Sequence, residues 1–590
     1  MKRWGLALFI GFWFLCSALT AFAAEDSSKT TTLADVFDQS VIIPYDFQGK
    51  AFANGKKIDL SHMNYRIVQR NGAILVPIRL MEYLATQSNG NKSTWMTSWQ
   101  PQKPDVVVLW NTQLRRSITF TVNSKTMVVN NEPQTMDVAP QKINGQIVLP
   151  LRSAAVALGK KIDWLDGLII IGDASIDLQS PQTLAIKDQI KAKLTDPRKP
   201  VTDNPIFPLT MYGDSVYYVK STYTATSVTE KLYKQTGGQK EVQVKLNGNA
   251  VFNSAKVFGD ELYFVTVVNN KAELDAYHLR NGTVRKVSSL GDWKPSDGWL
   301  EDIRRIDNDL YIMLHTGDLT MGGEKLYKVE NGALRSVAPA KSFISYEKSG
   351  NDMYFTNFAP MFNTADNLSR VDLITGETAA VGEPGFSYGI NRMVDEQSFG
   401  YGSVDALYVK DGYLYTLGFK ENDPQDRSAV YKIKLADNTQ VKLTAPAAQF
   451  WMKDSLIVYI DASTGYLESV DLDGANRRTL AQRRMMHVQL LNGNVYYLAN
   501  SGVGPEADWL YSYSLATGRE ARLSDRSVSS YYAGKAGIYY LSEGYEPGLY
   551  RVDPDGRNTS LVKDSIWSAN LTDEGIVYTL IYKNGVYSVK

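Results

Sequence analysis

The segment Asp553-Pro554-Asp555-Gly556 places two carboxylates two residues apart, a spacing that could hold a cation or supply a general acid and a general base. A helix-loop-helix calcium loop needs an oxygen ligand at position 5, glycine at position 6 and glutamate at position 12. Counted from Asp553, these positions hold Arg557, Asn558 and Asp564, so the calcium pattern fails.

Related segments occur elsewhere in the chain, at residues 371–377 (VDLITGE) and 470–476 (VDLDGAN). Asp and Gly recur in such segments because the aspartate side chain caps backbone N–H groups and glycine tolerates a positive φ. We therefore interpret the Asp553 pair as a turn that repeats along the chain, and we expect no metal ion or other cofactor there.

Other catalytic patterns are also missing, since the chain has no Walker phosphate loop and no His-Glu-x-x-His. We expect no serine hydrolase of the propeller peptidase type, because no chain is left after the repeats for a hydrolase domain. Two carboxylates that converge from distant repeats would leave no local pattern, so an enzyme remains the alternative to a binding protein.

The first residues have the pattern of a secretory signal. Lys2 and Arg3 precede an apolar run, and Ala21-Phe22-Ala23 precedes Glu25-Asp26. We expect residues 1–24 to be a signal peptide cleaved after Ala23 or Ala24, with an uncleaved anchor as the alternative. Because Cys16 is the one cysteine, the mature chain would have no thiol for catalysis, disulfides or metal ligation.

A duplicated module follows. Residues 71–79 (NGAILVPIR) and 144–152 (NGQIVLPLR) share one pattern, in which an Asn-Gly turn, a short strand and a proline precede a helix. The pair resembles the copper amine oxidase N-terminal-like domain, a stalk module of exported proteins of Gram-positive bacteria. On this resemblance we expect an α+β domain at residues 40–178. Arg79 and Arg152 are expected to cap backbone carbonyls, with binding of an anion as the alternative.

The resemblance implies no copper site. The chain has no Asn-Tyr-acidic sequence that could form the amine oxidase cofactor, and its histidines are scattered. These four histidines are His62, His278, His315 and His487.

Residues 179–208 are expected to link two domains. The spacing of Ile186, Ile190 and Leu194 predicts a short helix, and the prolines at 197, 200, 205 and 208 predict an extended, semi-rigid spacer.

Residues 209–590 repeat an apolar-Tyr pair, a loop, a second apolar-Tyr pair and a glycine turn, at the spacing of four-stranded propeller blades. This region resembles TolB-type β-propellers and a bacterial family of unknown function. The chain has nine such repeats, and we favour eight blades, with seven or nine as alternatives. The last repeat has no room for an outer strand, so we expect residues 201–209 to supply the fourth strand of the last blade. The first tyrosines of the repeats are Tyr217, Tyr263, Tyr311, Tyr354, Tyr415, Tyr459, Tyr496, Tyr539 and Tyr578.

The long loops of these repeats should emerge on one face, opposite the Asp-Gly turns. They are rich in aromatic and acidic residues, which suit sugar, peptide or protein surfaces. The candidate ligand-binding residues are Trp293, Trp299, Phe358, Phe362, Phe386, Tyr388, Asp423, Asp426, Glu506, Asp508 and Trp509.

We therefore expect a mainly β protein that is secreted or associated with the cell wall, monomeric and without catalytic activity. Its propeller rim would recognise an envelope protein or polysaccharide, with the N-terminal module as a stalk. Lys+Arg and Asp+Glu both number 63, so the charge gives no reason to expect a nucleic acid partner. The alternative is a polysaccharide- or peptide-processing enzyme with a site at the propeller axis.

Overall fold

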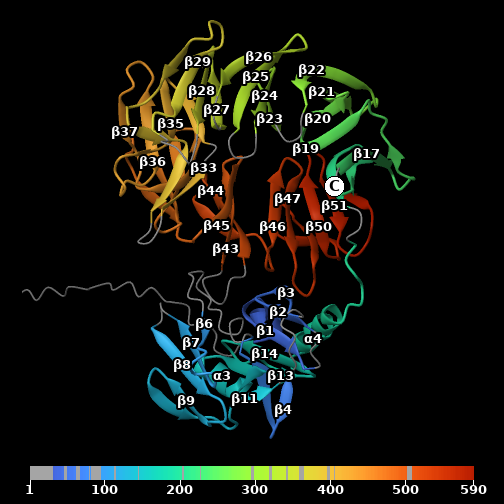
Figure 1. The fold of residues 1–590 in the computed structure, drawn as a ribbon, viewed down its shortest axis with the longest axis vertical. Helices are drawn as coiled ribbons and strands as arrows, with labels where there is room; N and C mark the ends of the chain where they lie inside the picture. Colours follow the sequence, from blue (N-terminus) through green and yellow to red (C-terminus); the bar gives the residue numbers. More distant parts are fainter. Residues whose placement is uncertain are drawn as a thin grey trace, which may run out of the picture.

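The chain folds into an N-terminal module and a ring of sheets above it (Figure 1). The computed structural model describes residues 31–45, 49–60, 67–78, 80, 95–111, 115–143, 145–201, 205–225, 228–293, 298–317, 322–339, 343–357, 365–394, 399–403, 406–500 and 508–590. The predicted signal peptide, residues 1–24, lies outside these ranges. Among the helices of the described residues, none is long and apolar enough to cross a membrane.

The N-terminal module is built from short strands and short helices. Its elements are α1 Leu33–Val36, the 3-10 helix η1 Phe37–Gln39, β1 Val41–Pro44, β2 Lys50–Ala53, β3 Lys56–Asp59, β4 Val68–Arg70, β5 Ala73–Pro77, β6 Met96–Trp99, β7 Val106–Asn111, β8 Arg116–Thr121, β9 Thr126–Val129, β10 Glu132–Thr135, β11 Gln141–Ile143, β12 Gln146–Pro150, α3 Leu151–Ala157, β13 Lys161–Leu165 and β14 Leu168–Gly172.

Three antiparallel sheets enclose the module's core. Their strand orders are β13-β14-β1-β2-β3, β10-β9-β8-β7-β6 and β11-β12-β5-β4. Alternate residues of the strands point inward, and the core buries Ile43, Phe120 and Leu149 completely. This duplicated α+β unit confirms the fold class predicted for the N-terminal region.

The helix α4, Pro181–Leu194, follows the module. Ile186, Ile190 and Leu194 lie on one buried face, and the hydroxyl of Thr183 accepts a hydrogen bond from the backbone N–H of Leu33. The helix therefore packs onto the module through α1.

The segment after α4 lies on the propeller. Arg198 forms ion pairs with Asp196 and with Asp564 of the propeller, and the N–H of Val201 donates to the carbonyl oxygen of Ile581. These contacts hold the segment after α4 against the ring at Arg198 and Val201.

The module also contacts the ring directly. The rings of Phe37 and Tyr545 meet edge to face with centroids 4.7 Å apart, and Asp38 accepts hydrogen bonds from Ser527. Burial at this contact raises the pKa of Asp38 to about 6, while hydrogen bonds from Ser527 and the charge of Arg526 oppose the rise. Module and propeller are therefore packed together through a partly apolar interface.

The first four blades of the propeller follow in chain order, and blades 1 and 2 join through the single pair Glu230 and Ala250. Blade 1 consists of β15 Ile206–Tyr212, β16 Ser215–Tyr223, β17 Val228–Thr236 and β18 Val242–Gln243, and blade 2 of β19 Asn249–Phe258, β20 Glu261–Val268, β21 Lys271–His278 and β22 Val284–Asp292. Blade 3 consists of β23 Gly298–Ile306, β24 Asp309–Thr316, β25 Gly323–Glu330 and β26 Ala333–Pro339, and blade 4 of β27 Phe343–Ser349, β28 Asp352–Asn357, β29 Leu368–Asp372 and β30 Thr378–Ala380.

Five further blades complete the ring. Blade 5 consists of β31 Phe386–Tyr388, β34 Leu407–Lys410, β35 Tyr413–Lys420, β36 Ala429–Lys434 and β37 Gln440–Lys442, with the added hairpin β32 Ile390–Val394 and β33 Phe399–Ser403. Blade 6 consists of β38 Ala447–Lys453, β39 Leu456–Asp461, β40 Leu467–Asp471 and β41 Arg478–Ala481, and blade 7 of β42 Met486–Leu491, β43 Asn494–Asn500, β44 Asp508–Ser514 and β45 Arg519–Arg522. Blade 8 consists of β46 Ser530–Gly534, β47 Gly537–Ser542, β48 Gly548–Val552 and β49 Asn558–Val562, and blade 9 of β50 Ile566–Leu571, β51 Ile576–Leu580 and β52 Val586–Val589.

The β-propeller predicted from the repeats is confirmed, and the described residues form nine blades. Nine was one of the alternatives, and the preferred count of eight is wrong. No repeat is displaced, since each of the nine first tyrosines lies buried in the second strand of its own blade.

The ring closes by packing of side chains. Residues 206–212 form β15 and pair with β16 of the first blade, so the prediction that residues 201–209 complete the last blade is wrong. Met211, Val216 and Tyr218 of blade 1 instead form one buried cluster with Val577 and Val586 of blade 9. Apolar contact between the first and last blades therefore holds the ring shut.

Candidate functional site

The Asp-Gly turns lie between the third and fourth strands of blades. Asp553 accepts hydrogen bonds from the Thr559 hydroxyl and from Arg551 Nε at 2.9 Å, and these contacts hold its pKa below the usual range. Asp555 accepts from the N–H of Arg557, and Gly556 has a φ of 82°. The interpretation of this carboxylate pair as a turn is confirmed.

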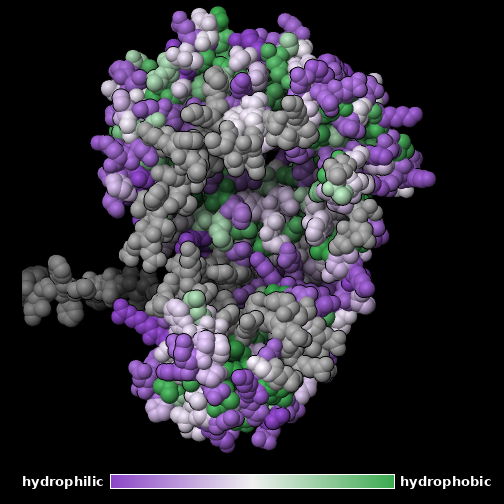
Figure 2. Space-filling model, in the orientation of Figure 1, coloured by the Kyte–Doolittle hydropathy of each residue, from purple (hydrophilic) through white to green (hydrophobic). Residues whose placement is uncertain are grey.

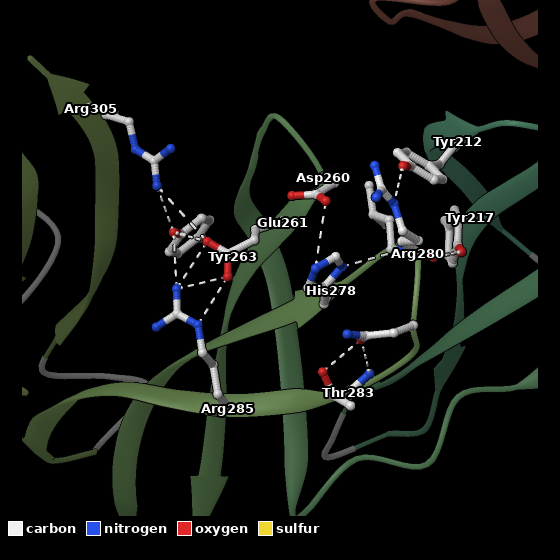
Figure 3. A network of polar contacts seen from close by, with 12 residues as sticks. Tyr212, Tyr217, Asp260, Glu261, Tyr263, His278, Arg280, Thr283, Arg285 and Arg305 are labelled. Atoms are coloured by element: carbon white, nitrogen blue, oxygen red, sulfur yellow. Dashed lines mark hydrogen bonds and ion pairs between the residues drawn. The ribbon is translucent and has the colours of Figure 1, made fainter. Parts of the chain in front are cut away.

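Other charges on the turn face connect blades to one another. In Figure 3, Arg285 and Tyr263 both donate to Glu261, and Arg305 of the next blade donates to the hydroxyl of Tyr263 at 3.0 Å. Nearby, the hydroxyl of Tyr217 donates to the carbonyl oxygen of Leu279 in blade 2. These groups stabilise the ring and leave the opposite face as the place for a ligand.

The opposite face carries the long loops. Gly298 at the start of β23 pairs with Thr316 at the end of β24, and Thr316 pairs with Gly323 at the start of β25. Loops that enter a blade and loops that join its second and third strands therefore share this edge, as predicted. The contacts of the N-terminal module with Ser527 and Tyr545, and of the segment after α4 with Ile581, belong to the same face, so the module and this segment cover it at blades 8 and 9.

The exposed part of this face includes a pocket of about 220 Å³ between blades 2 and 3. In the space-filling view the surface is also hollowed in the middle of the ring, above the module (Figure 2). The pocket is lined by Leu290, Asp292, Trp293, Gly298, Trp299, Leu314, His315 and Thr316. Two of the predicted ligand-binding residues, Trp293 and Trp299, thus line one pocket.

A row of three side chains crosses blade 3 beside the pocket. Trp299, His315 and Glu324 occupy paired positions on β23, β24 and β25. The rings of Trp299 and His315 stack with centroids 3.8 Å apart and an interplanar angle of 10°, and His315 Nδ1 lies 3.1 Å from Glu324 Oε1. The stacking and the imidazole-carboxylate contact hold the indole ring in a fixed orientation.

The row has polar groups at both ends. Trp299 Nε1 donates to Glu301 Oε2 at 2.6 Å. At the other end Glu324 Oε2 is a buried acceptor to which no described residue donates. The site therefore combines a fixed aromatic face with carboxylate groups close by, a composition suited to a polar ligand that has an apolar face.

The predicted residues of blade 5 make contacts within their own blade. Tyr388 is fully buried, with its hydroxyl 2.6 Å from Gln440, and half-buried Phe386 stacks on it. Asp426 accepts from the N–H of Lys420 and pairs with Lys442, while the carbonyl oxygen of Asp423 accepts from Arg392. These contacts place the Tyr388 side chain in the interior of blade 5, and a ligand role for Phe386, Asp423 and Asp426 stays a prediction.

Three predicted residues, Phe358, Phe362 and Glu506, lie outside the described residues. Asp508 begins β44, and its carbonyl oxygen accepts from the N–H of Val528. The neighbouring Trp509 packs against the cluster shared by blades 6 and 7, and Arg522 lies 4.3 Å from the centre of its ring. Neither residue lines the pocket between blades 2 and 3.

Residues 385–389, Gly-Phe-Ser-Tyr-Gly, match the Gly-x-Ser-x-Gly pattern, so the expectation that the chain lacks this motif is wrong. A nucleophile in that pattern sits exposed on a turn between a strand and a helix. Ser387 instead lies within strand β31, is fully buried and donates to Glu421 Oε2 at 2.7 Å. The match is therefore part of a blade rather than a nucleophile elbow.

His315 and Glu324 were missed in the sequence. Each is an isolated polar residue near a loop, with no partner close in sequence. The usable signal was the hairpin register, because pairing of Ile312 with Tyr327 also brings His315 opposite Glu324. Within the described part of the chain, no group of three or more His, Cys, Asp or Glu side chains could hold a metal ion.

Fold and site together define a class, a β-propeller joined to a duplicated α+β module. Residues 52–169 match the family model of the copper amine oxidase N-terminal domain, which confirms the resemblance seen in that region. No curated protein matches the chain.

Solved structures share the propeller fold. Dipeptidyl peptidase 4 of Porphyromonas gingivalis is 12% identical with a TM-score of 0.41, and the match covers 56% of this chain and 57% of that one. A prolyl endopeptidase is 13% identical with a TM-score of 0.34, covering 67% and 63%. The propeller domain of the Trilobed protease from Pyrococcus furiosus is 12% identical with a TM-score of 0.30, covering 55% and 99%. The chain thus spans less than two thirds of the first two proteins.

Proposed function

We propose that the protein is a secreted, non-enzymatic binding protein whose propeller face recognises a polysaccharide of the cell envelope. The observation that carries this proposal is the indole ring of Trp299, which is held by His315 on one face and lines an open pocket. The C–H face of a sugar ring packs on such a surface, while its hydroxyl groups bind nearby polar groups.

The size of the pocket favours a sugar over a protein partner. About 220 Å³ accommodates a single small ring, whereas a stable protein interface buries more than about 1,000 Å². Asp292 and Thr316 line the same pocket and offer oxygen atoms to hydroxyl groups. We therefore favour one residue of a polysaccharide, bound at the rim.

The enzyme alternative has one observation in its favour. His315 and Glu324 form an imidazole-carboxylate pair next to the pocket, and such pairs serve as general bases. Against this role, His315 is only 5% exposed and lies beneath the ring of Trp299. The pair is better placed to fix the indole ring than to reach a substrate.

Trp299→Ala tests the proposal. We expect at least a tenfold loss of affinity for whichever polysaccharides the wild type binds on a panel of immobilised acidic and neutral linear polymers, because the stacked ring is removed. Trp567→Ala is the matched control, since Trp567 is 68% exposed on blade 9, which blade 1 separates from the pocket between blades 2 and 3. The affinities are measured by biolayer interferometry.

Two results would contradict the proposal. One is unchanged binding by Trp299→Ala, or no binding of any polymer by the wild type. The other is release of new reducing ends or peptides by the wild type without added cofactor, which would favour the enzyme.

The proposed export has its own test. When the full chain is produced in a Gram-positive host, mass spectrometry of the culture fluid and wall fraction should find a protein that begins at Ala24 or Glu25, after cleavage at the small residues. Recovery of the chain only inside the cells, with Met1 retained, would refute export.

A further inference from the structure

The two copies of the N-terminal module are related by an internal two-fold axis. Strands β4 and β5 become β11 and β12 when 73 is added to their residue numbers. Strand β5 pairs antiparallel with β12, and Val76 faces Leu149, its own counterpart 73 residues on. The axis therefore passes between Val76 and Leu149.

The same symmetry produces two grooves. The larger, of about 750 Å³, runs from Gly72-Ala73-Ile74 of the first copy to Pro150-Leu151-Arg152 of the second. The other, of about 480 Å³, runs from Gly145-Gln146-Ile147 of the second copy to Pro77-Ile78 of the first. Each groove thus lies between the glycine turn of one copy and the proline end of strand β5 or β12 in the other.

Each groove contains one exposed tryptophan at an equivalent position. Trp164 lines the larger groove and pairs with Ile169, and Trp99 lines the smaller groove and pairs with Val107. Their exposed fractions are 44% and 54%, whereas most other large apolar side chains of the module are buried in its core; Met96 at 49% and Val156 at 61% are also exposed. Exposure of a large aromatic ring at two equivalent sites indicates a role in binding rather than in packing.

Contacts at the edges hold both indole rings. Trp99 Nε1 donates to the carbonyl oxygen of Pro104 at 3.1 Å, and the ring of Trp164 meets Tyr45 edge to face with centroids 5.1 Å apart. Strands β6 and β13, which carry the two tryptophans, are both edge strands of five-stranded sheets. The rings are thus oriented before any ligand arrives.

The grooves differ in charge. Arg152 is exposed at the start of α3, and no described residue accepts a hydrogen bond from it or pairs with it, so the capping role expected from the sequence is not seen there. Lys125 and the exposed Asp137 line the same groove, and so does Asp163, whose carboxylate accepts a hydrogen bond from the N–H of Ile176. The described lining of the smaller groove carries no charge, and Arg79, the counterpart of Arg152, lies outside the described residues.

We propose that the two grooves are a pair of binding sites for a linear polysaccharide, and that the larger groove selects an acidic sugar through Arg152. Trp164 and Trp99 stack on sugar rings, and Thr97, Ser98 and Gln146 in the smaller groove offer polar groups to hydroxyls. The uncommitted guanidinium of Arg152 can take a carboxylate in two parallel hydrogen bonds. These sites are separate from the propeller pocket and stand without it.

The experiment uses the full chain carrying Trp299→Ala, so that the propeller pocket does not contribute. Polygalacturonate, hyaluronan, carboxyl-reduced polygalacturonate and a linear β-glucan are immobilised, and binding is measured by biolayer interferometry. We expect binding to at least one acidic polymer, at least a tenfold loss for Trp164→Ala and for Trp99→Ala, and a larger loss for the double variant. Arg152→Gln should lower affinity for polygalacturonate to that for its carboxyl-reduced form.

Trp567→Ala is the control for removal of an exposed indole ring, and melting curves show whether each variant folds. Binding that survives in the folded double variant overturns the proposal, as does failure to bind any of the four polymers. A proline-rich peptide that binds in a Trp164-dependent manner would assign the grooves to a protein partner instead. If Trp299→Ala alone abolishes binding, and the Trp164 and Trp99 variants made in the wild-type chain bind as the wild type does, all polysaccharide recognition lies in the propeller.

Discussion

Val577→Asp is expected to destabilise the propeller by about 4 kcal/mol or more. Val577 is completely buried in the cluster that joins blade 9 to Met211, Val216 and Tyr218 of blade 1. No cation belongs to that cluster, so the new carboxylate would have to be buried uncompensated or open the ring. Calorimetry of the full chain should show a large fall in the melting temperature.

Two control variants separate closure from a general effect of the substitution. Val577→Ala removes only methyl groups and should cost about 2 kcal/mol. Val441→Asp places the same charge on the outer strand β37, where Val441 is 59% exposed, and should change stability by less than about 1 kcal/mol. If Val577→Asp has the same melting temperature as the wild type, this cluster does not hold the ring shut.

Asp38→Asn is expected to stabilise the docked module at neutral pH but not at pH 4. The folded pKa of Asp38 is raised from 3.8 to about 6, so folding is favoured while the carboxyl is protonated. This contribution is fully present below pH 3.8 and is lost as the pH rises through 6. Above that pH the charged carboxylate costs at most about 3 kcal/mol, which the amide avoids.

The measurement is the melting temperature of wild type and variant at pH 4.0 and pH 7.5. The groups around Asp38 are Ser527 and Arg526, with Tyr545, Asp525 and Glu546 close by, and they are the same in both proteins. We expect the variant to melt several degrees higher at pH 7.5 only, and the exposed control Asp188→Asn to change nothing. An equal shift at both pH values would show that ionisation of Asp38 does not govern docking.

The blades could be read from the sequence because each repeat carries its own tyrosine. Tyr217, Tyr263 and their counterparts lie on second strands, where the ring is buried and the hydroxyl can reach the next blade. The nine repeats also gave the number of blades, and the preference for eight came only from the usual range of four to eight blades. What the repeats did not show is how the ring closes, because Met211 and Val577 meet across the full length of the propeller region.

The site was only partly predictable. The long loops suggested Trp293 and Trp299, which line one pocket, but they also suggested Tyr388, whose side chain is buried in blade 5. The direction of a side chain on a short strand depends on register, and a shift of one residue reverses it. The pair His315 and Glu324 was missed for the same reason, because these residues become neighbours only when β24 and β25 are paired in the correct register.

The exchange of strands within the module bears on how it folds. Strand β7 of the first copy pairs with β8 of the second, and β14 of the second pairs with β1 of the first, so both five-stranded sheets contain strands of both copies. One copy alone would leave the edges of β1 and β7 unpaired, which only another copy can satisfy. Each five-stranded sheet is complete only when both copies are present, so the two copies form one folding unit.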